Sequence, residues 1–142
     1  MTVRLGGSVI DDSGRRYLPI IDEPTESQVD EIISLYATYE GILEISHQPE
    51  PALGPYRLTL YAEKEGVLLK NGKWLYLLLL GQYEPNGDVR VRTIDNKEFE
   101  PGLAIHWGDY YPSRARTRDL ELVRHVFKEF ARTGNVSEDI MS

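Results

Sequence analysis

Cysteine is absent from this 142-residue sequence, which excludes a disulfide framework, thiolate chemistry and a cysteine-type zinc site. The first residues also lack the basic segment and the uninterrupted apolar core of a secretory signal peptide. The longest apolar run, Trp74 to Leu80, is far too short to cross a bilayer. We therefore expect a cytoplasmic protein with no membrane contact.

Positive charge is scarce in the first half of the chain. Residues 1–66 contain 12 Asp and Glu against 5 Lys and Arg, whereas residues 67–142 contain 11 of each, so the first half carries the whole net charge of -7. An acidic field repels phosphate backbones and steers basic partners. This distribution disfavours direct nucleic-acid binding and favours a basic protein partner, the alternative being an acidic face kept for solubility.

Repeats, low-complexity stretches and linker-like segments are absent as well. A chain of 142 residues has the usual size of one compact core. Hydrophobic residues make up 41% and charged residues 27% of the chain, which is typical of globular proteins and unlike disordered ones. We therefore expect residues 1–142 to form a single domain.

Two segments have the apolar spacing of amphipathic helices, one from residue 24 or 25 to about residue 38 and one over residues 117–133. In the second segment we expect Thr117 as the N-cap and Gly134 as the residue that ends the helix. The apolar stripes contain Val29, Ile32, Ile33 and Tyr36 in the first segment and Leu120, Val123, Val126, Phe127 and Phe130 in the second.

The rest of the sequence reads mainly as strands. Asn71-Gly72 supplies the two positive-φ positions of a type I′ turn and predicts an antiparallel hairpin. The run Trp74 to Leu80 is interpreted as a buried central strand or as part of a dimer interface, which leaves the oligomeric state open. We expect an α+β fold, in which two helices pack on an antiparallel meander sheet of five to six strands. Strand patterns cover residues 3–10, 15–20, 42–46, 56–62, 67–70, 73–80, 89–94 and 103–107.

Catalytic motifs are lacking. His47, His106 and His125 are dispersed and form none of the spacings typical of metal ligands. Neither a Gly-x-Ser-x-Gly elbow nor a phosphate-binding glycine loop is present. We therefore expect no catalytic residue, no metal and no cofactor, and a protein that is not an enzyme.

One loop combines aromatic and basic residues in an unusual way. Such a combination can stack on bases and contact phosphates, so a nucleic-acid or phosphate-ligand binding module at this loop is the alternative function. We favour a structural role for the loop, or a role as an alternative protein interface. Its residues are Trp107, Asp109, Tyr110, Tyr111, Arg114, Arg116 and Arg118.

Three sequence stretches carry a resemblance to a known class of proteins. They are YRLTLYAEKEGVLLKNGKWLYLLLLG, GDYYPSRARTRD and the closing segment LVRHVFKEFARTGNVSEDI, with its Phe-x-x-Phe-x-x-x-Gly ending and acidic tail. Together with the first helix, they resemble bacterial immunity proteins of polymorphic-toxin and contact-dependent growth-inhibition systems. The resemblance covers about residues 25–140 and not the first 20 residues.

This resemblance implies a cytoplasmic protein that binds the toxic C-terminal domain of a cognate effector, frequently a nuclease, and blocks its active site or substrate groove. Because a nuclease needs a basic groove, the acidic first half agrees with this implication. We expect the toxin to contact the acidic residues that precede and line the first helix. They are Asp11, Asp12, Asp22, Glu23, Glu26, Asp30 and Glu31.

Overall fold

The computed structural model describes residues 2–65 and 73–142. The elements follow one another as β1 (Thr2–Asp11), β2 (Gly14–Tyr17), β3 (Ile21–Asp22), α1 (Glu26–Ser34), the 3₁₀ helix η1 (Leu35–Ala37), β4 (Glu40–Gln48), β5 (Gly54–Lys64), β6 (Trp74–Tyr83), β7 (Val89–Arg92), β8 (Leu103–His106), β9 (Asp109–Pro112), the 3₁₀ helix η2 (Ser113–Ala115), β10 (Arg116–Thr117) and α2 (Leu120–Thr133).

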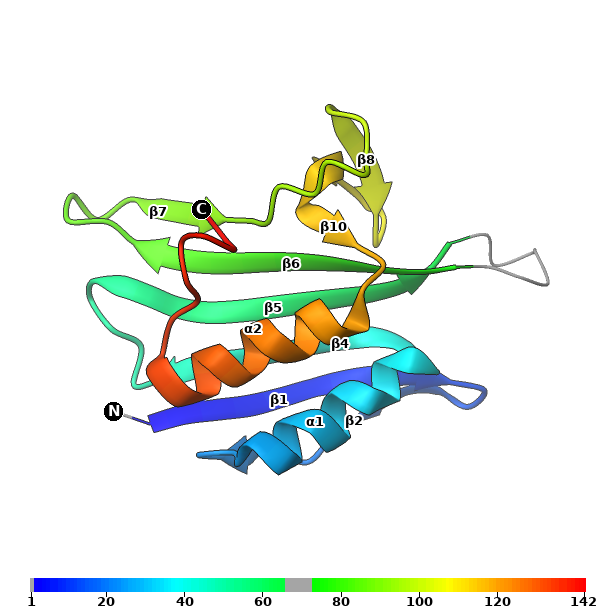
Figure 1. Ribbon diagram of the computed structural model, residues 1–142. Helices are drawn as coiled ribbons and strands as arrows, with labels where there is room; N and C mark the ends of the chain where they lie inside the picture. The colour runs from blue at the N-terminus through cyan, green and yellow to red at the C-terminus, as the bar shows by residue number, and fades with distance from the viewer. Residues whose placement is uncertain (1, 66–72) are drawn as a thin grey trace.

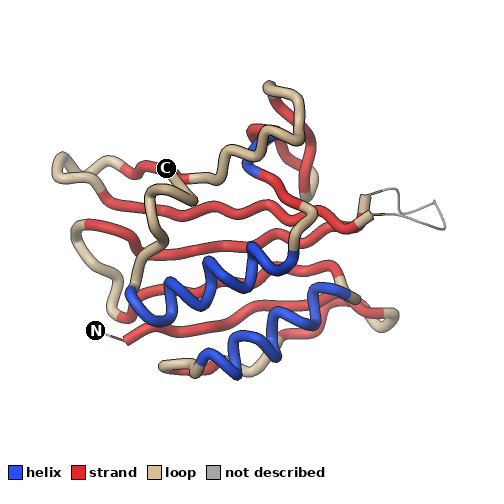
Figure 2. The backbone as a smooth tube through the Cα atoms, in the orientation of Figure 1, coloured by secondary structure: helices blue, strands red, loops and turns tan. Residues whose placement is uncertain are grey.

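Most strands of the described part of the chain belong to one antiparallel sheet (Figure 1). Its six-stranded path has the order β10-β6-β5-β4-β1-β2, and β3 and β7 extend it beside β1 and β6. Both helices cross the same face of this sheet, as the tube in Figure 2 also shows. The predicted α+β class, with an antiparallel sheet and two helices packed on it, is confirmed.

The two helices begin at side-chain caps. At α1, the Thr25 side chain accepts a hydrogen bond from the backbone N–H of Gln28, and the Gln28 side chain accepts one from the backbone N–H of Thr25. At α2 the N-cap is Asp119 and not the predicted Thr117, because Thr117 pairs with Tyr76 in the sheet. Gly134 ends α2 with a φ of 77°, as its sequence position predicts.

Two of the predicted hairpins involve neighbouring strands of the sheet. At the N-terminus, β1 pairs with β2 through a turn that follows Asp11, as expected. Farther along, β5 pairs with β6 up to the pair Lys64 and Trp74. The Asn71-Gly72 turn and the strand predicted over residues 67–70 lie outside the described residues.

The expected continuation of the meander through residues 103–107 is wrong. The chain reverses at Trp107 and Gly108, whose φ angles are 54° and 80°, so β8 pairs with β9 in a separate hairpin. Two central residues with positive φ form a two-residue hairpin turn of the primed kind. The outer edge of β6 is therefore occupied by β7 and β10.

The main core lies between the sheet and the helices. The apolar side chains of both helices are buried against alternate residues of β1, β4, β5 and β6. From α1 these are Val29 and Ile33, and from α2 they are the residues of the predicted stripe except Leu120, which is half-buried. Burying a large apolar side chain contributes about 1.5–3 kcal/mol relative to leaving it exposed. Gly41 belongs to this packing, because a Cβ there would lie 2.9 Å from the Tyr36 ring.

Candidate functional site

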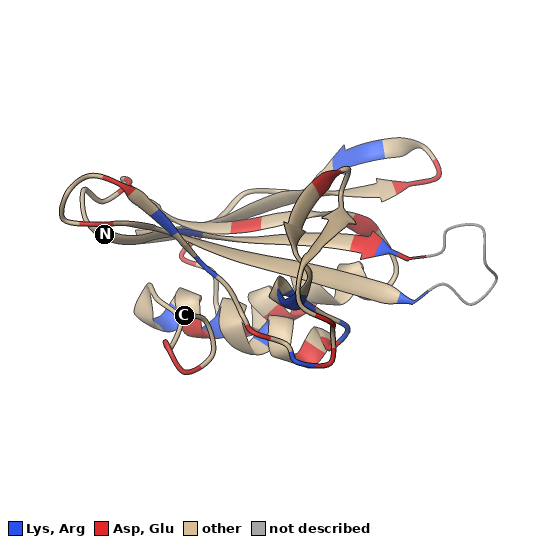
Figure 3. Cartoon of the chain, turned by 90° about the horizontal axis from the view of Figure 1, so that it is seen from above, with Lys and Arg blue, Asp and Glu red and all other residues tan. Residues whose placement is uncertain are grey.

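The face of the main sheet that points away from α1 and α2 is here named the open face. Strand register assigns its residues, because side chains alternate between the two faces and paired residues share a face. Leu5, Ile45 and Leu58 pair across three strands and are buried against the helices, so the residues between them belong to the open face. Figure 3 shows both helices on one side of the sheet.

Exposed apolar side chains form two groups on the open face, one at β1 and β2 and one on β7. Nine large hydrophobic residues of the described chain are exposed, and register places four of them on this face. A fifth, Ile20, lies beside Gly6 of the open face, with its Cγ1 3.7 Å from where a glycine Cβ would be. Clustered exposed apolar side chains mark interaction sites, whereas scattered ones carry no such meaning. The five are Ile10, Tyr17, Ile20, Val89 and Val91.

Small side chains occupy the middle of the open face. Ser8 and Thr59 are each only 5% exposed, and half-buried Ser46 lies between Arg4 and Arg57 in the register. Larger side chains, including Tyr17 at 76% exposure on β2 and Val91 on β7, stand on the outer strands. The middle of the face therefore combines these small side chains with half-buried Ile42 and Tyr61, and the exposed apolar side chains stand along its two sides.

An aromatic pair stands at the β7 side of the open face. The rings of Tyr56 and Tyr83 stack with their centroids 4.5 Å apart, and the Tyr83 hydroxyl hydrogen-bonds the Glu50 carboxylate. Gly81 lets the Tyr56 ring lie flat on the sheet, because a Cβ at that position would be 2.5 Å from the ring carbon Cζ. The Arg57 guanidinium lies 5.6 Å from the centre of the Tyr56 ring.

Three carboxylates of the long strands lie on the open face, those of Glu40, Glu44 and Glu63. Glu40 accepts a hydrogen bond from the backbone N–H of Lys64, and Glu63 accepts one from that of Trp107. Among the described residues, none of the three forms an ion pair with a lysine or an arginine. Their negative charge is therefore directed to solvent or to a partner.

The β8–β9 hairpin covers one corner of the open face. The His106 Nε2–H donates to the Tyr61 carbonyl at 2.8 Å, and the Tyr61 ring lies 6.3 Å from that of Trp107 and 6.2 Å from that of Tyr111. Burial of the imidazole lowers the pKa of His106 below its usual range, and the nearby Glu63 carboxylate opposes this only partly. His106 is therefore neutral near pH 7 and acts as a structural contact.

The arginines of the predicted aromatic and basic loop bind other groups of the protein. Arg116 is buried, donates to Ser113 and lies 4.8 Å from the centre of the Phe99 ring. Arg114 donates to the Phe99 carbonyl, and Arg118 pairs with Glu65 at 2.6 Å. Their main contacts are thus with the protein itself, which agrees with the structural interpretation of the loop.

The aromatic and acidic residues of this loop are divided between two sides of the hairpin. Trp107 and Tyr111 are half-buried against β5, whereas Asp109 and Tyr110 are exposed. Leu103 and Ile105 of β8 are also exposed, on the same side of the hairpin as Tyr110. This outer side is a second, smaller apolar patch.

The seven acidic residues predicted to contact a toxin do not share one surface. Asp11 and exposed Asp12 lie at the β1–β2 turn, whereas Asp22, with the exposed Glu23 after it, pairs with Arg4. The seven steps along the strand from Arg4 to Asp11 span about 23 Å. The acidic residues of the first half are therefore spread along an edge of the molecule.

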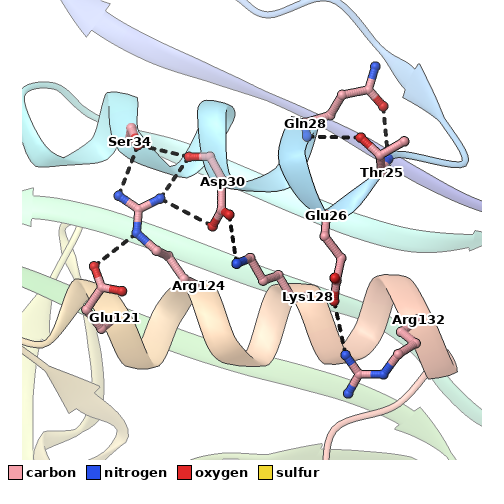
Figure 4. A network of polar contacts seen from close by, with 9 residues as sticks. All are labelled: Thr25, Glu26, Gln28, Asp30, Ser34, Glu121, Arg124, Lys128 and Arg132. Atoms are coloured by element: carbon pink, nitrogen blue, oxygen red, sulfur yellow. Dashed lines mark hydrogen bonds and ion pairs between the residues drawn. The ribbon is translucent and has the colours of Figure 1, made fainter.

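The three remaining acidic residues are on α1, and two of them face α2 (Figure 4). Glu26 pairs with Arg132 at 3.2 Å, and Asp30 pairs with Lys128 at 2.7 Å and with Arg124 at 3.6 Å. These contacts neutralise the two carboxylates and join the helices. Of the three, exposed Glu31 has no ion pair within the described part of the chain.

The histidines lie in separate parts of the fold. His47 is on the helix side of β4 and its Nε2–H donates to the Gly134 carbonyl, His106 is in the hairpin on the opposite side, and His125 is exposed on α2. Within residues 2–65 and 73–142, no group of three or more His, Asp or Glu residues is arranged to hold a metal ion. A shallow pocket beside His47 is lined also by Glu23 and Arg132, and Arg132 is paired with Glu26.

The chain matches one described protein family. A family model described as a family of unknown function, DUF6911, matches residues 2–140. The chain belongs to the DUF6911 family. No curated protein matches it.

A solved structure has the same fold. It is the crystal structure of a hypothetical protein from Neisseria gonorrhoeae, with a TM-score of 0.76 and 24% sequence identity over 96% of this chain and 90% of that chain. At this identity the likeness concerns the fold of this DUF6911 protein alone. In the described residues, no helix is long and apolar enough to cross a membrane.

The open face was missed in the sequence because strand alternation marks two faces without telling which one the helices cover. The alternation itself was visible in β4, where residues 42, 44 and 46 oppose 43 and 45. Exposed Ile10, Tyr17 and Ile20 precede the first helix and carried no recognisable motif.

Proposed function

We propose that this DUF6911 protein is an immunity protein that binds and neutralises the toxic C-terminal domain, a nuclease, of a cognate contact-dependent growth-inhibition effector. The observation that carries the proposal is the open face, which presents two groups of exposed apolar side chains along its sides and the unpaired Glu44 carboxylate in its middle. The sequence resemblance to immunity proteins supports the choice of partner. Action in the cytoplasm, on a toxin that has entered the cell, belongs to the same proposal.

The dimensions of the open face suit a protein partner. Its four long strands contain nine to eleven residues each, and together with β2 they extend over about 33 Å by about 24 Å, on the order of 800 Å². A standard interface takes about this area from each protein. The β8–β9 hairpin covers one corner and adds its own exposed residues beside the face.

Inhibition by this face needs no chemical step. A rigid sheet loses little conformational entropy on binding, which favours affinity. The open-face carboxylates, which form no ion pair with a lysine or an arginine of the described residues, attract the basic surface that a nuclease uses for its substrate, and this attraction speeds association. A docked immunity protein then excludes nucleic acid from that surface.

The experiment is titration calorimetry between this protein and the C-terminal domain of the large secreted effector encoded immediately upstream. We expect a tight one-to-one complex, and growth of cells that produce the toxin domain should be restored by co-expression. A titration without heat at several temperatures, together with no growth rescue, would overturn the proposal.

The alternative, a nucleic-acid or phosphate-ligand binding module at the loop from Trp107 to Arg118, has less support. Phosphate contacts require guanidinium groups that point to solvent. Arg116 is buried, and Arg114 and Arg118 make the internal contacts described above.

A further inference from the structure

Glu44 lies in the middle of the open face. Its strand, β4, has β1 on one side and β5 on the other, and its neighbours in register are Gly6 and Thr59. The Glu44 side chain is half-buried, and within the described residues it has no side-chain hydrogen bond and no ion pair. A carboxylate in this setting keeps its bonding capacity for a group from outside the chain.

The other carboxylates of the first half differ from Glu44 in position or in pairing. Glu26 and Asp30 are neutralised by α2, and Asp22 is neutralised by Arg4. Glu40 already accepts a backbone hydrogen bond at the end of β4. Glu44 is thus the central acceptor of the face, with both oxygens available.

The surroundings of Glu44 define the shape of what can reach it. Its register partners Gly6 and Thr59 are small, and its open-face neighbours on β4 are Ile42 and Ser46. Larger side chains stand on both sides, with Ile20 beside Gly6 on one side and Tyr56 and Val91 on the other. A long basic side chain from a partner can reach the carboxylate between these groups.

The positive charges near this region do not compete for Glu44. Arg4 is paired with Asp22 at 2.7 Å, and the Arg57 guanidinium lies over the Tyr56 ring. Neither comes within ion-pair distance of Glu44. Glu44 therefore has no ion pair of its own, although Arg4 and Arg57 flank it diagonally in the register, and a partner that excludes water strengthens an ion pair formed there.

We propose that Glu44 is the anchor of the interface and accepts a lysine or arginine side chain carried on a basic segment of the toxin domain. This inference rests on the proposed function and adds the face, the central residue and the chemistry of the partner. Charged residues at the centre of an interface dominate its affinity, whereas charges at the rim mainly change the association rate.

The test compares Glu44→Gln with Glu31→Gln. Both substitutions remove one negative charge from an unpaired carboxylate, but exposed Glu31 is on α1, on the opposite side of the sheet. Titration calorimetry against the upstream-encoded toxin domain should show at least about a 30-fold weaker Kd for Glu44→Gln, because truncating one partner of a desolvated charge pair has an effect of this size. Glu31→Gln should stay within about threefold of the wild type.

A second pair of variants tests the face without changing its charge. Tyr17→Ala removes an exposed ring from the open face, and Leu53→Ala removes an exposed side chain from the β4–β5 loop. Tyr17→Ala should weaken binding and Leu53→Ala should not. Circular dichroism and thermal unfolding of each variant establish that it is folded.

Three outcomes separate the two proposals. Weakened binding by the two open-face variants with unchanged binding by the two controls supports the inference. Wild-type affinity in folded Glu44→Gln and Tyr17→Ala overturns the inference and leaves the immunity function standing. A wild-type protein that does not bind the toxin domain overturns the immunity function, and the inference fails with it.

Discussion

Replacing Arg92 by methionine should destabilise the protein strongly. Arg92 has no exposed surface and donates five hydrogen bonds, to Gln82, Asn135, Val136 and, twice, Met141, over distances of 2.6–3.2 Å. Each buried acceptor left without a donor costs about 1–3 kcal/mol, and removing a buried charge returns part of this loss. We expect the free energy of unfolding to fall by about 3 kcal/mol, and Tm by about 10 °C.

The control for this prediction is Arg90→Met on the same strand. Arg90 is exposed and its contact with Glu84 is 3.9 Å long, so this change should cost at most about 0.5 kcal/mol. Urea unfolding measures both variants, and amide hydrogen exchange should accelerate over residues 135–142 in Arg92→Met alone. Equal stability of the two variants would show that the buried guanidinium does not hold the C-terminal segment.

Three further predictions concern protonation, the helix pair and the loop. Because burial lowers the pKa of His106, the unfolded state takes up a proton first as the pH falls. Stability is then complete above about pH 6.5 and declines below it by at most about 1.4 kcal/mol per pH unit. Urea unfolding between pH 7 and 5 should show a shallower decline in His106→Gln, and equal slopes would contradict this. Asp30→Ala removes contacts with two cations of α2 and should cost about 1 kcal/mol in thermal unfolding, whereas an unchanged Tm would mean that this ion-pair network contributes nothing. Alanine at Arg114, Arg116 and Arg118 should leave nucleic-acid retention at low salt unchanged in a mobility assay. Salt-sensitive retention by the wild type that the triple variant loses would instead support the alternative function.

Local sequence signals predicted much of the fold. The apolar stripe and Gly134 marked α2, and the polar turn after Asp11 marked the first hairpin. These signals depend on neighbours in sequence and are therefore readable without the tertiary structure. The misplaced strand at residues 103–107 shows the limit, because its pattern suits a strand of the large sheet and of a separate hairpin equally well.

The candidate site depended on information that the sequence does not hold. Charge counts located the acidic excess in the first half, and the seven acidic residues were chosen from it. In the folded protein, Glu26 and Asp30 are no longer free to bind a partner, because they form ion pairs with α2. The cations come from about a hundred positions later in the chain. Glu44 stayed unpaired for the same reason, since register surrounds it with Gly6 and Thr59.

By itself, the sequence determined the fold class, the helix stripes, the lack of cysteine chemistry and the acidic first half, because these follow from composition and local periodicity. Only the tertiary structure decided which side of the sheet the helices cover and which carboxylates find partners within the chain. The physical reason is that alternation along a strand is symmetric between its two faces. That symmetry is broken by long-range packing, which leaves Glu44 and the exposed aromatic and aliphatic residues on the open face.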